Sequence, residues 1–96
     1  MPPRYAKRVD ENQPGIVEDL RNTPGVTVAV NHDDILVGYN GRTYWFEVKN
    51  PDVIGKNGKP RPSALKRSQV KLRKIYTGHY SVVWTLDQIL EEIGLI

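Results

Sequence analysis

The chain of 96 residues carries 14 lysines and arginines against 11 aspartates and glutamates, which gives a net charge of +3. Its length supports one domain over residues 1–96 and leaves no room for a second. The absence of cysteine excludes disulfide scaffolds, thiolate zinc sites and cysteine nucleophiles.

The N-terminal segment carries no sign of secretion. Met1-Pro2-Pro3-Arg4 leads into charged residues and not into an apolar core, so we expect a cytoplasmic protein. No apolar run approaches the ~18 residues of a membrane span, so no membrane partner is expected. Residues 1–9 are predicted to be a loose arm. A first helix is predicted over 12–21, because Pro14 suits its first turn and an apolar stripe follows.

Three strands are predicted next, over 26–30, 34–39 and 42–49, since these runs are rich in β-branched and aromatic residues. The second and third are separated only by Asn40-Gly41, the pair typical of a type I′ hairpin turn. We therefore expect a tight antiparallel hairpin.

A Pro/Gly/Lys-rich segment, 50–62, follows and is predicted to be a basic loop, mobile in the free protein. Ser63 is expected to cap a second helix that reaches about Thr77, with Gly78 as its terminating residue. A last strand is predicted over 81–85. The capping-box pattern at 85–88 predicts a final helix. The predicted elements then follow the order α-β-β-β-α-β with a C-terminal helix, which indicates an α/β (α+β) fold.

The hairpin predicts two carboxylates side by side. If Asn40-Gly41 is the loop, Asp34 lies directly opposite Glu47 on one face of the sheet. Two opposed like charges are unfavourable unless a cation lies between them, and Mg²⁺ and Mn²⁺ prefer carboxylate oxygens. Asp33 would face the other side, opposite Val48, unless a bulge shifts the register.

Lys49 follows Glu47 by two residues and is expected on the same face, while Val48 points the opposite way into apolar packing. A lysine beside metal-bound carboxylates can position a water molecule or stabilise developing negative charge. The competing interpretation is an exposed strand of mixed charges.

These residues resemble a known family. Asp34-Ile-Leu-Val-Gly38 followed by Glu47-Val-Lys49 is similar to the D…(D/E)xK core of the PD-(D/E)XK nuclease superfamily. Asn12-Gln13 before Ile-Val-x-x-Leu, and Leu65-x-x-x-Gln69, resemble its virus-type replication-repair nuclease (VRR-NUC) group. The similarity covers roughly residues 10–94. It implies a restriction-endonuclease-like core, with a small mixed sheet flanked by helices, and a phage or other viral origin, hence the host cytoplasm.

The resemblance also implies the residue roles. Asp34 and Glu47 would ligate Mg²⁺ or Mn²⁺, with the backbone carbonyl of Val48 as a further ligand. Lys49 would orient or activate the attacking water, and Gln69 would support Lys49 or the scissile phosphate. Gln13 would take the first-helix position that often holds Glu in relatives. Because Gln13 is neutral, and because the usual Pro before the first Asp is absent, we expect one well-held cation and a less secure second one.

The charge is concentrated in one segment. Residues 50–80 carry eight basic side chains and one acid, a charge of +7, and the remainder is −4. Such a block suggests a polyanion partner at one edge, although basic clusters often only confer solubility. The candidates for contact with a nucleic-acid backbone are Lys56, Lys59, Arg61, Lys66, Arg67, Lys71, Arg73 and Lys74.

The leading hypothesis is a metal-dependent endonuclease that hydrolyses DNA phosphodiester bonds and is structure-specific or weakly sequence-selective. The resemblance also implies a homodimer, because small members of the superfamily often act as homodimers. One alternative is a catalytically inactive nucleic-acid-binding module of the same fold. An RNA-directed nuclease is another, because contacts to a 2′-hydroxyl cannot be read from sequence. A protein-interaction domain with a basic docking face is a third.

Overall fold

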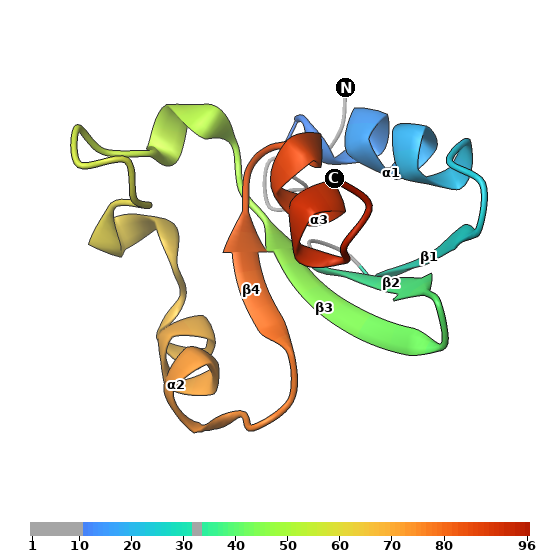
Figure 1. Cartoon of the computed structure of the whole chain (residues 1–96). Helices are drawn as coiled ribbons and strands as arrows, with labels where there is room; N and C mark the ends of the chain where they lie inside the picture. The colour runs from blue at the N-terminus through green and yellow to red at the C-terminus, as the bar shows by residue number, and fades with distance from the viewer. Residues whose placement is uncertain (1–10, 32–33) are drawn as a thin grey trace.

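The computed structural model describes residues 11–31 and 34–96 (Figure 1). The predicted arm 1–9 and the prediction for Asp33 lie outside the described residues. The helices and strands, in chain order, are α1 (Gln13–Arg21), β1 (Val26–Asn31), β2 (Asp34–Tyr39), β3 (Arg42–Val48), α2 (Arg67–Ile75), β4 (Tyr80–Val83) and α3 (Leu86–Glu92).

The four strands form one mixed sheet in the order β1-β2-β3-β4. β1, β2 and β3 are antiparallel neighbours, whereas β3 and β4 are parallel. Parallel strands need a long crossover, and the segment that carries α2 supplies it. The predicted mixed α+β class with a small mixed sheet is therefore confirmed.

The β2–β3 hairpin has the predicted geometry. Asn40 and Gly41 have φ of 53° and 78°, the positive values that a type I′ turn requires at both central positions. The resulting register pairs Tyr39 with Arg42 and Asp34 with Glu47. No bulge shifts the pairing along these two strands.

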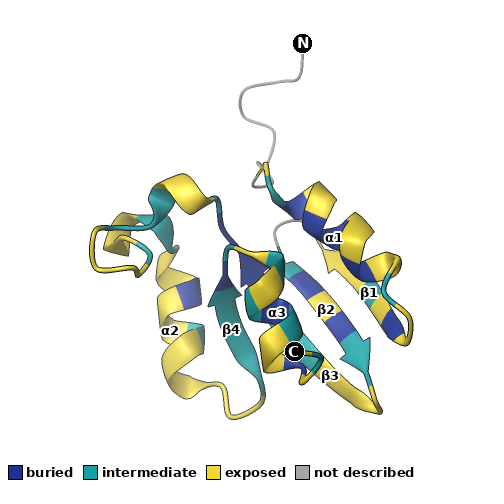
Figure 2. Ribbon diagram, turned by 45° about the horizontal axis from the view of Figure 1, so that its top comes forward, coloured by how far each residue is buried: buried dark blue, intermediate teal, exposed yellow. Residues whose placement is uncertain are grey.

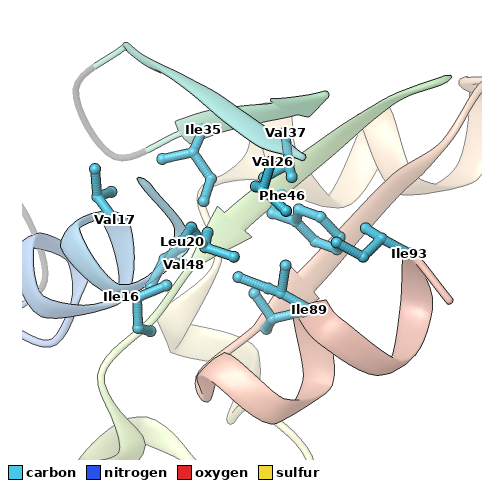
Figure 3. Packing of buried hydrophobic residues seen from close by; sticks show 11 residues of the cluster. Ile16, Val17, Leu20, Val26, Ile35, Val37, Phe46, Val48, Ile89 and Ile93 are labelled. Carbon is cyan, nitrogen blue, oxygen red and sulfur yellow. The ribbon is translucent and has the colours of Figure 1, made fainter. Parts of the chain in front are cut away.

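The two faces of the sheet have different neighbours. On one face Ile35, Val37, Phe46 and Val48 are fully buried beneath α1 and α3 (Figures 2 and 3). The helices contribute Ile16, Val17, Leu20, Ile89 and Ile93 to this core. Side chains that alternate with the core residues, including Asp34 and Glu47, therefore point to the opposite face.

The second helix is shorter than predicted. It begins at Arg67, and Ser63 lies in a separate 3₁₀ turn, Pro62–Ala64, so the capping role predicted for Ser63 is wrong. The physical reason is the extended backbone of Leu65 and Lys66, with ψ of 133° and 155°, which separates the two turns.

The end of α2 also differs from the prediction. Tyr76 leaves the helix in an extended conformation, with ψ of 125°, and Gly78 is absent from the positive-φ glycines of the described chain. Gly78 has another use: a Cβ there would lie 2.7 Å from Cε2 of Tyr76. The glycine thus makes room for the tyrosine ring instead of capping the helix.

The C-terminal capping box is confirmed. Oγ1 of Thr85 accepts a 3.2 Å hydrogen bond from the Gln88 N–H, and Oε1 of Gln88 accepts one of 3.0 Å from the Thr85 N–H. The longest helices in the described part of the chain have nine residues, and none is long and apolar enough to cross a bilayer.

The basic segment 50–62 carries local order. It contains a 3₁₀ turn, Pro51–Val53, and a bridge between Ile54 and Pro60. The Arg61 N–H donates to the Val53 carbonyl at 2.9 Å, which closes the segment into a loop. That this loop is mobile in the free protein stays a prediction.

Candidate active site

Asp34 and Glu47 face each other across β2 and β3, on the face of the sheet away from the core. Residues paired in this way have Cβ atoms ~4.5–5.5 Å apart. Glu47 is 1% exposed, and Oδ1 of Asp34 is buried without a hydrogen-bond partner among the described residues. The hairpin register alone therefore brings the two predicted carboxylates together.

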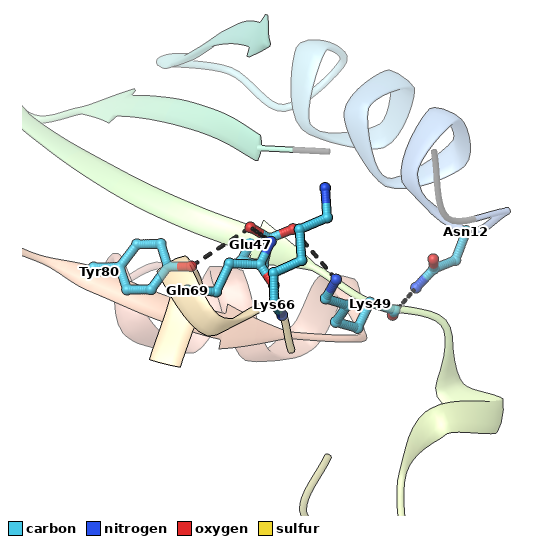
Figure 4. Close-up of polar contacts among 6 residues, drawn as sticks. All are labelled: Asn12, Glu47, Lys49, Lys66, Gln69 and Tyr80. Carbon is cyan, nitrogen blue, oxygen red and sulfur yellow. Dashed lines mark hydrogen bonds and ion pairs between the residues drawn. The ribbon is translucent and has the colours of Figure 1, made fainter. Parts of the chain in front are cut away.

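Three side chains surround the Glu47 carboxylate (Figure 4). Nε2 of Gln69 donates a 2.7 Å hydrogen bond to Oε1, and the Tyr80 hydroxyl donates a longer one, 3.5 Å, to the same oxygen. Nζ of Lys49 lies 3.8 Å from Oε2. Three of the four residues predicted to be catalytic, Glu47, Lys49 and Gln69, are thus in contact, and Asp34 is the cross-strand neighbour of Glu47.

Gln69 is held from both ends of its amide. Its Oε1 accepts a 2.9 Å hydrogen bond from the backbone N–H of Lys66, the residue before α2, while its Nε2 donates to Glu47. Gln69 is 8% exposed, and the orientation of its amide follows from these two partners. One side chain therefore fixes the start of α2 against the end of β3.

Lys49 is 7% exposed and sits where β3 ends. Its backbone N–H donates to the Val83 carbonyl at 2.9 Å, which extends the β3–β4 pairing by one residue. Its own carbonyl accepts a 2.9 Å hydrogen bond from Nδ2 of Asn12, which also donates to the Trp84 carbonyl at 3.0 Å. Asn12 thus joins the start of α1 to the residues that directly follow β3 and β4.

Sequence reasoning missed the structural roles of Asn12 and Tyr80. The sequence motif assigns Asn12 no contact of its own, because its two hydrogen bonds span 37 and 72 residues. Tyr80 reaches Glu47 because β4 lies parallel to β3, a pairing that no local pattern indicates. Burial of the phenol, and the negative charges of Glu47 and Asp34, raise the pKa of Tyr80 well above its ordinary value. The hydroxyl is therefore a neutral donor near neutral pH.

These groups open onto a cleft with a volume of about 340 Å³. Its lining consists of Asp34, Glu47, Lys66, Ser68, Gln69, Leu72 and Tyr80.

All eight basic residues predicted to contact a nucleic acid are exposed, and they lie on the 50–62 loop and on and beside α2. Lys66 brings one of these charges to the cleft itself, whereas the Arg61 guanidinium donates to the Asp52 carbonyl.

The residues fit a hard divalent cation. Asp34, whose buried Oδ1 has no hydrogen-bond partner among the described residues, lines a cleft that also holds the carboxylate of Glu47. The ammonium of Lys49 lies beside Glu47 and Lys66 lines the same cleft, so a cation would share the two carboxylates with two lysines. In the described ranges no three His, Cys, Asp or Glu residues cluster, so backbone or water oxygens would complete the shell, as Mg²⁺ commonly accepts.

Two further predicted ligands are buried. Gln13 is 2% exposed at the first residue of α1, and Val48 is fully buried at the last residue of β3. Their roles as ligands stay predictions.

In comparisons with known proteins, no protein-family model, curated protein or solved structure matches the chain. The case for a function therefore rests on the geometry of the site.

Proposed function

We propose that this protein is a Mg²⁺- or Mn²⁺-dependent endonuclease that hydrolyses DNA phosphodiester bonds, built on a restriction-endonuclease-like core of the VRR-NUC type. The observation that carries the proposal is the register-matched pair of half-buried Asp34 and buried Glu47, with the buried Lys49 beside it. Two carboxylates held side by side, one of them buried, cost stability unless a cation compensates their charge.

Asp34 and Glu47 would hold the cation, with the Val48 carbonyl as a further ligand and Gln13 as a candidate outer one. When bound, Mg²⁺ or Mn²⁺ polarises the scissile phosphate and stabilises negative charge on the leaving oxygen. Gln69 and Tyr80 donate to Oε1 of Glu47, so they fix the direction of that carboxylate. A fixed ligand needs no reorganisation during the reaction.

Lys49 would act on the attacking water. Its ammonium is largely buried and lies 3.8 Å from Oε2 of Glu47, next to one of the two proposed ligands. There it would orient the water for in-line attack and stabilise the charge that develops on the phosphate.

The exposed basic residues of the loop and α2 would contact the DNA backbone. Such contacts neutralise phosphates without reading sequence, so binding would be weakly selective and strongly dependent on salt. Homodimerisation, which would place two such sites on one DNA, belongs to the same proposal.

The test is cleavage of supercoiled plasmid with Mg²⁺, Mn²⁺ or EDTA by the wild-type protein and by Lys49→Ala. We expect metal-dependent nicking that Lys49→Ala and Glu47→Gln reduce at least 100-fold, about 2.7 kcal/mol of transition-state stabilisation. Glu18→Gln, a change to an exposed carboxylate on α1, is the matched control and should cut normally.

Two outcomes would redirect the proposal. Equal cleavage by wild type and Lys49→Ala would place the activity elsewhere. Absence of cleavage on plasmid and on branched duplexes, combined with DNA binding, would favour the inactive binding module. A labelled RNA strand of the same sequence, cut faster than DNA, would identify the RNA-directed alternative.

A further inference from the structure

An apolar hollow lies directly beside the carboxylate cleft. It has a volume of about 340 Å³, in the range of small-ligand pockets, and Ala29, Val30, Leu36, Trp45 and Tyr76 supply its apolar lining. Asp34 lines both this hollow and the cleft, so the two are adjoining compartments of one surface.

The register of the sheet explains why the compartments adjoin. Ala29, Leu36 and Trp45 are paired across β1, β2 and β3 and form one row. Asp34 and Glu47 belong to the row two residues further along, on the same face. Two residues of a strand span ~6.5–7 Å, about the separation between a phosphate and the base of its own nucleotide.

Two aromatic rings form one wall of the hollow. Trp45 and Tyr76 meet edge to face with centroids 5.3 Å apart, and Tyr76 is 46% exposed. Gly78 leaves the space in which the Tyr76 ring lies. The wall is therefore built by specific packing, yet a large part of the tyrosine ring is open to a ligand.

We propose that this hollow binds an unpaired nucleobase of the strand whose phosphate lies at Asp34 and Glu47, with the base packed against Leu36, Trp45 and Tyr76. The identity of the neighbouring site as a nuclease centre rests on the proposed function. The base pocket itself rests on the two compartments that share Asp34.

Charge complementarity favours a nucleic-acid strand as the occupant. Tyr76 follows directly after Arg73, Lys74 and Ile75 at the end of α2, whose basic residues are exposed. A strand with its phosphates along this helix would bring a base to the tyrosine ring. Aromatic rings beside a basic track are the usual construction of single-strand binding surfaces.

The proposal narrows the class of substrate. A paired base is stacked inside its duplex and cannot enter a hollow in a protein surface, so the base must be unpaired or extruded. Extrusion is least costly where the nucleotide is already unpaired. We therefore infer a preference for flaps, gaps, bulges or single strands over intact duplex.

The test measures binding without catalysis. Wild-type protein in EDTA is titrated with a duplex that carries one unpaired 2-aminopurine nucleotide, and with the same duplex carrying an abasic site there. We expect stacking to quench the 2-aminopurine fluorescence and the base to tighten binding at least about fivefold over the abasic duplex. Tyr76→Ala and, separately, Leu36→Ala should reduce that ratio toward one while affinity for plain duplex is unchanged.

Ile75→Ala is the matched control, because Ile75 is 62% exposed and does not line the hollow. It should keep the wild-type ratio. Equal binding of the base-containing and abasic duplexes would overturn the proposal. So would a wild-type dimer that Tyr76→Ala converts to monomer in sedimentation, since a second copy would then cover the hollow. Base-dependent binding by a protein that cleaves nothing would instead refute only the nuclease proposal.

Discussion

Nε2 of Gln69 donates a 2.7 Å hydrogen bond to Oε1 of Glu47, and this contact connects α2 to the site. The amide oxygen is already used by the Lys66 N–H, so only the amino group is left to face the carboxylate. The position of α2, with its basic residues, is thereby coupled to the orientation of Glu47.

Gln69→Leu preserves much of the side-chain volume and removes both hydrogen bonds. Hydrogen bonds to charged groups contribute ~1.5–3 kcal/mol, so we expect the free energy of unfolding to fall by about 2 kcal/mol. Urea denaturation in EDTA measures this change. Ser68→Ala, at the exposed neighbouring position, should be nearly neutral. A Gln69→Leu variant as stable as wild type would mean that the contact does not hold α2.

Asp34→Asn should make the metal-free protein more stable and inactive. The change removes the like-charge repulsion with Glu47, which we expect to be worth about 1 kcal/mol in a partly buried pair. Thermal unfolding in EDTA compares the two proteins. Saturating Mn²⁺ should raise the midpoint of wild type and leave that of Asp34→Asn nearly unchanged. A less stable variant in EDTA would argue that Asp34 has a structural partner.

Asn12→Ala should loosen the junction of α1 with the sheet. It removes two hydrogen bonds, to the carbonyls of Lys49 and Trp84, and we expect a loss of ~1–3 kcal/mol in stability. Because Lys49 sits at this junction, plasmid cleavage should fall as well. Denaturation and cleavage are measured on one preparation, beside Asn22→Ala on the exposed end of α1. Equal effects of the two substitutions would refute the clamp.

Tyr80 should ionise later than an ordinary tyrosine as the pH rises, because burial and the charges of Glu47 and Asp34 raise its pKa. The folded protein holds this proton more tightly than the unfolded chain. The resulting stabilisation is therefore full below the ordinary tyrosine pKa of about 10 and is lost as pH rises above it. Absorbance titration at alkaline pH follows the phenolate. The Tyr80→Phe protein should lack the ionisation that occurs at the highest pH in the wild-type titration. A titration identical to that of wild type would contradict the assignment of this ionisation to Tyr80.

The carboxylate pair could be predicted from sequence because it depends on local chemistry. Asn40-Gly41 selects a two-residue turn, that turn fixes the register, and the register places Asp34 opposite Glu47. The residues between them need only point alternately to the two faces of the sheet. No contact outside the hairpin enters this derivation.

The remaining features depend on long-range packing. Tyr80 contacts Glu47 only because β4 returns parallel to β3 after the α2 crossover. The start of α2 at Arg67 depends on the Gln69 amide, whose second partner comes from β3. Propensity alone favoured a start at Ser63, since serine is a good N-cap. Tertiary contacts decided the boundary instead.

The most direct test of the central claim is calorimetric titration with Mn²⁺ of the wild-type protein and of the Asp34→Asn and Glu47→Gln variants. We predict at least one site per chain in wild type, abolished or weakened at least tenfold in both variants and unchanged in Glu18→Gln. Wild-type protein that binds no Mn²⁺, or variants that bind it as tightly, would contradict the assignment of Asp34 and Glu47 as the cation ligands.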